Sequence, residues 1–114
     1  KQIDVFLDDR EAYKISSLRI NSLDLLIQKL KKFGKVFLIR MPISKEYLNL
    51  ENLFYPQFEA IIDSLSLKNN ISFINYNNNN NRKLLYKTYD GHHIDKNGGK
   101  LFTQALCDSI NLDY

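Results

Sequence analysis

Apolar residues recur at helical spacing in three segments of the chain. Residues 21–34 carry the first stripe, with Asn21 as the expected N-cap, Asp24 three residues later and Gly34 as the stop, and its apolar members are Leu23, Leu26, Ile27, Leu30 and Phe33. The second stripe predicts a helix over 55–67 with Pro56 in its first turn, and consists of Phe54, Phe58, Ile61, Ile62 and Leu65. The third helix is predicted to begin near Lys96, with Asp95 as its cap, and to turn one face inward through Leu101, Phe102, Ala105, Leu106 and Ile110.

Short apolar runs between these helices have the character of strands. Residues 36–41, VFLIRM, form a continuous run that ends at Pro42, as expected for a strand covered on both faces. Residues 71–76, ISFINY, form the next strand, and DVFL at 4–7 is a shorter third candidate. Because strands and helices alternate, we expect parallel pairing with right-handed crossovers. The predicted fold is one α/β domain over 1–114, a three-layer α/β/α sandwich of the flavodoxin-like kind.

The predicted sheet is short of strands. Sheets usually hold about four to six strands, whereas this pattern supplies two or three. We therefore expect an incomplete domain, whose sheet is completed either by upstream sequence or by a partner subunit in a homo-oligomer.

Composition adds mainly exclusions. The chain is 44% hydrophobic and 25% charged, with a net charge of +3, which is ordinary for a globular domain. The densest lysine group, at 29, 31, 32 and 35, is interpreted as a solvated helix face, so no nucleic-acid partner is predicted. No apolar run approaches the ~20 residues of a transmembrane helix. A single cysteine, Cys107, excludes an internal disulfide. No cofactor is predicted, and composition leaves the compartment open.

A polar loop over 77–89 leads to the most distinctive motif of the chain. Its five asparagines at 77–81 are not expected to join a core. DGHH at 90–93 follows the loop, and its Asp90 and His93 have the spacing D-x-x-H just before the last helix. In an open parallel sheet, the loops that leave the carboxyl ends of strands form the ligand crevice. Asp90 can fix the tautomer of His93, which then serves as a general base and acid.

Gly98 and Gly99, in the first turn of the last helix, are expected to allow close packing of the backbone.

The stretch DGHHIDKNGGKLF resembles the last motif block of the SGNH (GDSL-like) hydrolases. KVFLIRMPIS, the helix after it and ISFINY resemble the last two strands of that fold, in the branch with acyltransferase-like proteins of bacterial cell-surface polymers. The resemblance covers about residues 20–112. It implies that Asp90 and His93 are the acid and base of a Ser-His-Asp triad acting on ester-bearing carbohydrates or lipids.

The chain also departs from that family. The family's Gly-Asp-Ser nucleophile motif is absent, since glycine occurs only at 34, 91, 98 and 99, and Asp108–Ser109 lies inside the last helix. The oxyanion-hole blocks are not recognisable either. Because oxyanion donors carry a large share of the rate enhancement in acyl transfer, we expect this chain alone to be catalytically silent.

Four further residues are candidate substrate contacts, although capping or loop-pinning roles are also open for them: Arg40, Ser44, Tyr89 and His92. Other readings of the motif remain. Asp90 and His93 can instead belong to a capped loop. A metal site from Asp90, His92, His93 and Asp95 is a further alternative, although it would crowd four ligands into six residues. Cys107 as a nucleophile is the last alternative, and a cysteine beside an apolar helix stripe is usually an inert side chain. The rival function is a non-catalytic binding or assembly domain.

Overall fold

The computed structural model describes residues 15–78 and 93–112 and shows a mixed α/β arrangement. Within these residues there are four helices and a two-stranded parallel sheet. In chain order the elements are α2 (Ser17–Leu30), β1 (Phe37–Arg40), α3 (Lys45–Phe54), α4 (Phe58–Asn69), β2 (Ser72–Asn75) and α5 (Lys96–Leu112). The predicted strand at 4–7 lies outside the described residues.

The two predicted strands pair in parallel, as the alternation of elements indicated. Phe37 lies opposite Ser72 at the start of the ladder and Arg40 lies opposite Asn75 at its end. One more backbone hydrogen bond, from the Tyr76 amide to the Arg40 carbonyl at 3.1 Å, extends the pairing past β2. The connection between the strands carries α3 and α4, as parallel strands require a crossover segment.

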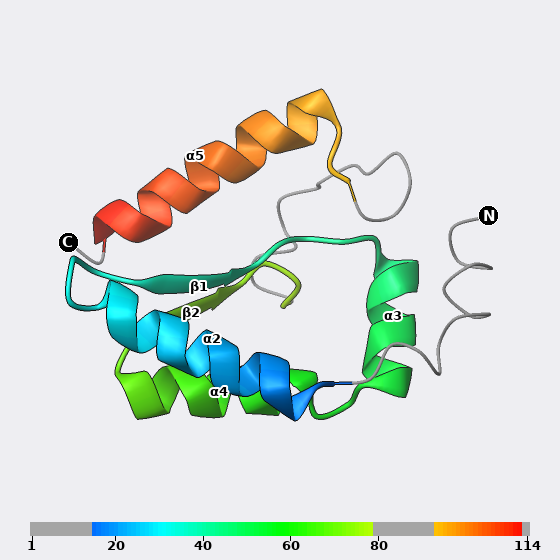
Figure 1. The fold of residues 1–114 in the computed structure, drawn as a ribbon. Coiled ribbons are helices and arrows are strands. Elements are labelled where there is room, and N and C mark those ends of the chain that lie inside the picture. The colour runs from blue at the N-terminus through cyan, green and yellow to red at the C-terminus, as the bar shows by residue number, and fades with distance from the viewer. Residues whose placement is uncertain (1–14, 79–92, 113–114) are drawn as a thin grey trace.

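The helices lie on both sides of the strand pair (Figure 1). There α2 and α4 lie below the strands and α5 lies above them, while α3 stands beyond the carboxyl end of β1. The α5 contact is made by Tyr76, whose ring meets Phe102 edge-on with centroids 4.8 Å apart. The Tyr76 hydroxyl is also 3.2 Å from the Ser109 hydroxyl oxygen. Buried side chains from all four described helices and from Tyr76 make the core: Ile27, Tyr47, Leu48, Ile62, Leu65, Tyr76 and Phe102.

Helix α2 begins earlier than the sequence pattern predicted. Its N-cap is Ser16, whose hydroxyl accepts a 3.3 Å hydrogen bond from the Arg19 amide, so Asn21 as the cap is wrong. Asp24 faces α4 instead of closing a cap: it accepts hydrogen bonds from Lys68 at 2.6 Å and from Asn69 at 2.8 Å. The Lys68 ammonium, followed by the Asn69 amide, lowers the pKa of Asp24 from its ordinary 3.8 to about 2.

The segment between the strands holds two helices where the pattern predicted one. Ser44 caps α3, which the prediction missed, and Tyr55 ends it. Pro56 was predicted in the first turn of a helix, but it lies between α3 and α4. Because proline has no amide hydrogen, it cannot continue the hydrogen-bond ladder of α3. Helix α4 ends at Asn69, and its C-cap Asn70 adopts the left-handed conformation with φ 52°. The Ile71 amide then bonds the Ser66 carbonyl at 3.0 Å, the closing contact of a Schellman motif.

The sequence pattern predicted burial wrongly in three places: on α2, at β1 and at Leu101 on α5. Leu26, Leu30 and Phe33 are 51%, 46% and 88% exposed, because α2 turns Ile27 rather than these residues towards α4 and the strands. Both strands are half-buried along their length, since each has a partner on one side only within the described residues. Leu101 is 48% exposed, whereas its neighbour Phe102 is buried as predicted.

Candidate functional site

The carboxyl ends of β1 and β2 carry a cluster of polar side chains. Arg40 and Asn75 are the last residues of their strands and lie opposite each other in the ladder. The Arg40 guanidinium donates to Glu51 on α3 at 2.8 Å and to Glu59 on α4. The Asn75 amide donates to the same Glu59 carboxylate at 2.9 Å. We call Arg40, Glu51, Glu59 and Asn75 the strand-end cluster.

The cluster is partly shielded from solvent. The Arg40 side chain is 10% exposed and its guanidinium carbon lies 5.1 Å from the centroid of the Phe58 ring, a cation–π distance. Glu51 and Glu59 are 29% and 47% exposed. The two carboxylates therefore occupy the guanidinium of Arg40, and a substrate carboxylate has to displace one of them to reach it.

Asn77 ties the loop after β2 to the loop after β1. Its side-chain oxygen accepts from the Ile43 amide at 2.9 Å, and its amide donates to the Met41 carbonyl at 2.8 Å. The Asn77 backbone amide in turn donates to the Asn75 side chain at 2.9 Å. Asn77 is 5% exposed, so the prediction that the asparagine tract stays out of the core is wrong at its first residue. The asparagine satisfies loop backbone groups that burial would otherwise leave without water.

Ser44 follows β1 on the side of its carboxyl end, as predicted, and it has a capping role. The Ser44 hydroxyl accepts a 3.3 Å hydrogen bond from the Tyr47 amide at the start of α3. A hydroxyl in this position satisfies one of the free amides of the first helical turn. Substrate contact by Ser44 stays a prediction.

His93 is exposed and lies directly before α5. The Asp95 carboxylate accepts from the Gly98 amide at 2.7 Å, and the Asp95 carbonyl accepts from the Gly99 amide at 2.8 Å. The predicted cap of this helix is therefore confirmed. A β-carbon at Gly99 would meet no atom within 4 Å, so close packing is not the reason for that glycine.

Asp90, the predicted partner of His93, lies outside the described residues, as do the predicted substrate contacts Tyr89 and His92 and the rest of the loop over 79–92. The acid-base pair, its capped-loop alternative and the metal alternative stay predictions. Among residues 15–78 and 93–112, no three acidic, histidine or cysteine side chains are grouped to hold a metal ion.

Helix α5 places His93 and Cys107 far apart. The helix starts on the side of the molecule where β1 ends and runs back above the strands (Figure 1). Cys107 is exposed on the later part of α5, about 16 Å along the helix axis from Lys96, the first residue of the helix, at 1.5 Å per residue. His93 cannot deprotonate a thiol at that distance, which removes Cys107 as its nucleophile.

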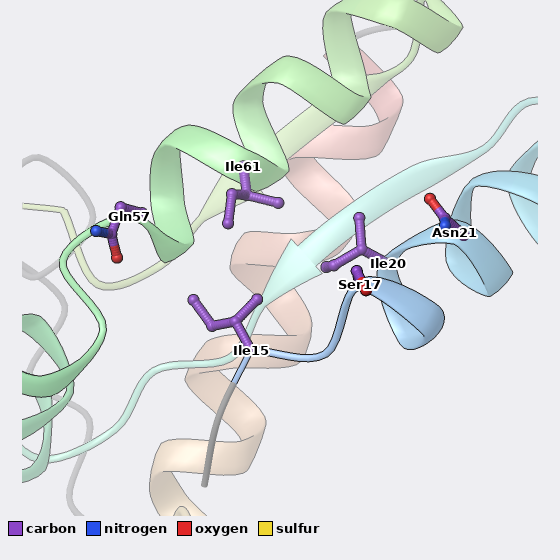
Figure 2. Close-up of a pocket in the computed structure, with 6 residues that line it drawn as sticks. All are labelled: Ile15, Ser17, Ile20, Asn21, Gln57 and Ile61. Atoms are coloured by element: carbon purple, nitrogen blue, oxygen red, sulfur yellow. The ribbon is translucent and has the colours of Figure 1, made fainter.

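A separate pocket of about 390 Å³ lies between the first turns of α2 and α4. In Figure 2 the side chains of Ile15, Ile20 and Ile61 point towards one another, with polar residues around them. The lining consists of Ile15, Ser17, Ile20, Asn21, Gln57 and Ile61. The predicted site residues do not line this pocket, and the sequence offered no motif for it.

No helix in the described part of the chain has both the length and the apolar character needed to cross a membrane. Comparison with models of known protein families, with curated proteins and with solved structures finds no match to this chain.

Proposed function

We propose that this chain is the Asp/His-bearing carboxyl-terminal part of an SGNH-like ester hydrolase or O-acyltransferase that acts on carbohydrate or lipid esters. The observation that carries the proposal is the position of His93. It is exposed and stands directly before the capped helix α5, which starts on the side where the parallel strands end. Ligand crevices of open parallel sheets lie on that side.

The arrangement of elements supports the finer fold that goes with this proposal. A β1–α4–β2 unit with parallel strands, helices α2 and α4 on one side and α5 on the other is what a three-layer, flavodoxin-like sandwich requires. We propose that the two described strands belong to such a sheet, and that further strands come from upstream sequence or from a partner subunit.

In the proposed reaction the Asp90 carboxylate orients the ring of His93. His93 takes the proton from a serine hydroxyl as it attacks the ester carbonyl, and returns that proton to the leaving alcohol. The serine and the oxyanion donors come from outside this chain. Ser44, His92 and Tyr89 are proposed substrate contacts. Arg40 contacts substrate only by exchanging one of its two carboxylate partners, and otherwise shapes the rim.

The test uses the complete product of the gene that encodes this chain and follows p-nitrophenyl acetate hydrolysis. His93→Ala is expected to lower kcat/KM by about a thousandfold or more, as loss of a catalytic base does. The matched variant His92→Ala is expected to keep kcat within about threefold and to change mainly KM, because His92 is proposed to contact substrate and has no role in proton transfer. Equal losses in the two variants, or a gene product without esterase activity, would overturn the proposal.

The pocket between α2 and α4 supports a second candidate, a non-catalytic binding domain. Its volume falls in the range of small-molecule sites, about 300–1,000 Å³, and three isoleucines line it. The test is binding of the fluorescent apolar probe anilinonaphthalene sulfonate to the gene product, with Ile61→Trp as the variant that fills the pocket. If the gene product has no esterase activity and Ile61→Trp abolishes probe binding, this candidate is favoured over the first.

A further inference from the structure

The turn that joins α2 to β1 exposes apolar and basic side chains together. Phe33 is 88% exposed and Leu30, in the last turn of α2, is 46% exposed. Lys29, Lys32 and Lys35 are exposed around them. We call Lys29, Leu30, Lys32, Phe33 and Lys35 the basic tip.

All charged side chains of the basic tip are positive. Residues 25–45 contain no aspartate or glutamate, and their cations include the three lysines of the basic tip. The neighbouring Lys31 has its ammonium on the Asn69 carbonyl, which fixes the tip against the end of α4. The Lys35 ammonium lies 5.7 Å from the centroid of the Phe37 ring. The basic tip is therefore held by packed elements while its apolar ring projects into solvent.

The apolar part of the surface extends along α2. Leu25 and Leu26 are 60% and 51% exposed, so α2 presents apolar side chains on a second face besides the one that packs on α4. Large apolar side chains interspersed with lysines suit the boundary of an anionic bilayer, where the rings enter the headgroup region and the ammonium groups meet lipid phosphates.

We propose that the basic tip docks this protein on an anionic lipid surface, with Phe33 inserted among the headgroups. A second copy is a poorer occupant, because a two-fold contact would bring the lysines of two basic tips together. The tip stands at the amino end of β1 and Arg40 at its carboxyl end. Docking therefore turns the strand-end cluster away from the lipid.

The test is co-sedimentation of the purified full chain with vesicles of neutral phosphatidylcholine, or of phosphatidylcholine mixed with phosphatidylglycerol. Binding is expected for the anionic vesicles only. Phe33→Ser, and Lys32→Glu combined with Lys35→Glu, are each expected to lower the partition coefficient about tenfold or more. The matched changes Leu101→Ser and Lys100→Glu on α5, also at exposed positions, are expected to leave it within about twofold.

Several results would overturn the proposal. They are absence of binding, equal binding to neutral and anionic vesicles, and equal loss in the tip and α5 variants when circular dichroism shows all of them folded. A concentration-dependent dimer that Phe33→Ser dissociates, without vesicle binding, would assign the surface to a second copy instead.

Discussion

Arg40 joins four elements of the fold through one guanidinium group. It ends β1, bonds glutamates on α3 and α4, and shares Glu59 with Asn75 at the end of β2. A cation in this position offsets the repulsion between the two carboxylates, and together they hold the loops that leave both strands. The strand-end cluster therefore holds the carboxyl ends of both strands and the starts of their loops in a fixed arrangement.

Replacing Arg40 tests that structural role. Arg40→Met leaves two neighbouring carboxylates without a cation, and we expect a loss of about 2 kcal/mol in the free energy of unfolding. This is less than the ~3–5 kcal/mol of a fully buried pair because both glutamates reach solvent. Urea denaturation measures it. Arg19→Met, on the exposed side of α2, is the control and is expected to change stability by no more than about 0.5 kcal/mol. Equal losses would contradict the role given to the cluster.

Asp24 makes the free energy of unfolding depend on pH in the acid range. Its pKa in the folded protein, about 2, lies below its ordinary value of 3.8, so its contribution is complete above about pH 4 and is lost as the pH falls towards 2. Asp24→Asn is therefore expected to lower the urea midpoint at pH 7 and to make little difference at pH 2. Asp63→Asn, at an exposed carboxylate on α4, serves as the control. A difference between wild type and Asp24→Asn that stays constant with pH would contradict this account.

Single-residue roles were the least predictable from the sequence. Asp24 had the position of an acid near a helix start, yet its partners lie on α4, far along the chain. Asn77 stood in a run of identical residues, and only the meeting of two loops buries it. Glu51 and Glu59 had no motif at all. Such roles depend on contacts between distant segments, which local spacing does not contain.

At the scale of elements, Ser44 has two roles to consider, as the cap of α3 and as a proposed substrate contact, and a pair of variants tests the first. As a helix cap, Ser44→Ala is expected to cost about 1 kcal/mol of folding stability, and Ser44→Asp to retain most of it, because a carboxylate also accepts from the first-turn amides. Thermal unfolding measures the difference. If both variants are as stable as the wild type, the hydroxyl does not cap α3 in solution.

Helix α5 depends on Phe102 for its contact with the rest of the fold. Phe102 is 7% exposed and packs edge-on against Tyr76. Phe102→Ala is expected to cost about 3 kcal/mol or more, whereas Leu101→Ala at the neighbouring, half-exposed position is expected to cost less than about 1 kcal/mol. Chemical denaturation of the two variants checks this. The reverse order would mean that α5 packs through a different face.

The elements themselves followed from the sequence wherever the periodicity was long. Helices α2, α4 and α5 and both strands lie where apolar spacing predicted them, with shifts at their ends. Helix α3 was missed because its buried side chains, Tyr47 and Leu48, are adjacent and form no stripe at helical spacing. The signal that was available is Ser44 followed by Glu46, a cap and a first-turn acid.

At the scale of the whole molecule, the parallel α/β arrangement is confirmed and the number of strands limits the rest. A continuous apolar run such as 36–41 predicts burial on both faces, but β1 is half-buried with β2 as its neighbour in the described residues. Leu26 and Phe33 have the same explanation, since periodicity shows that a helix has an apolar face without showing what covers it.

The proposed catalytic pair of Asp90 and His93 can be observed directly in a crystal structure of the protein. We predict an Asp90 carboxylate oxygen within about 3.2 Å of a ring nitrogen of His93, the range of a hydrogen bond, at the carboxyl end of the parallel sheet. A structure in which the two side chains face apart, with Asp90 bonded only to backbone amides of its own loop, would contradict it.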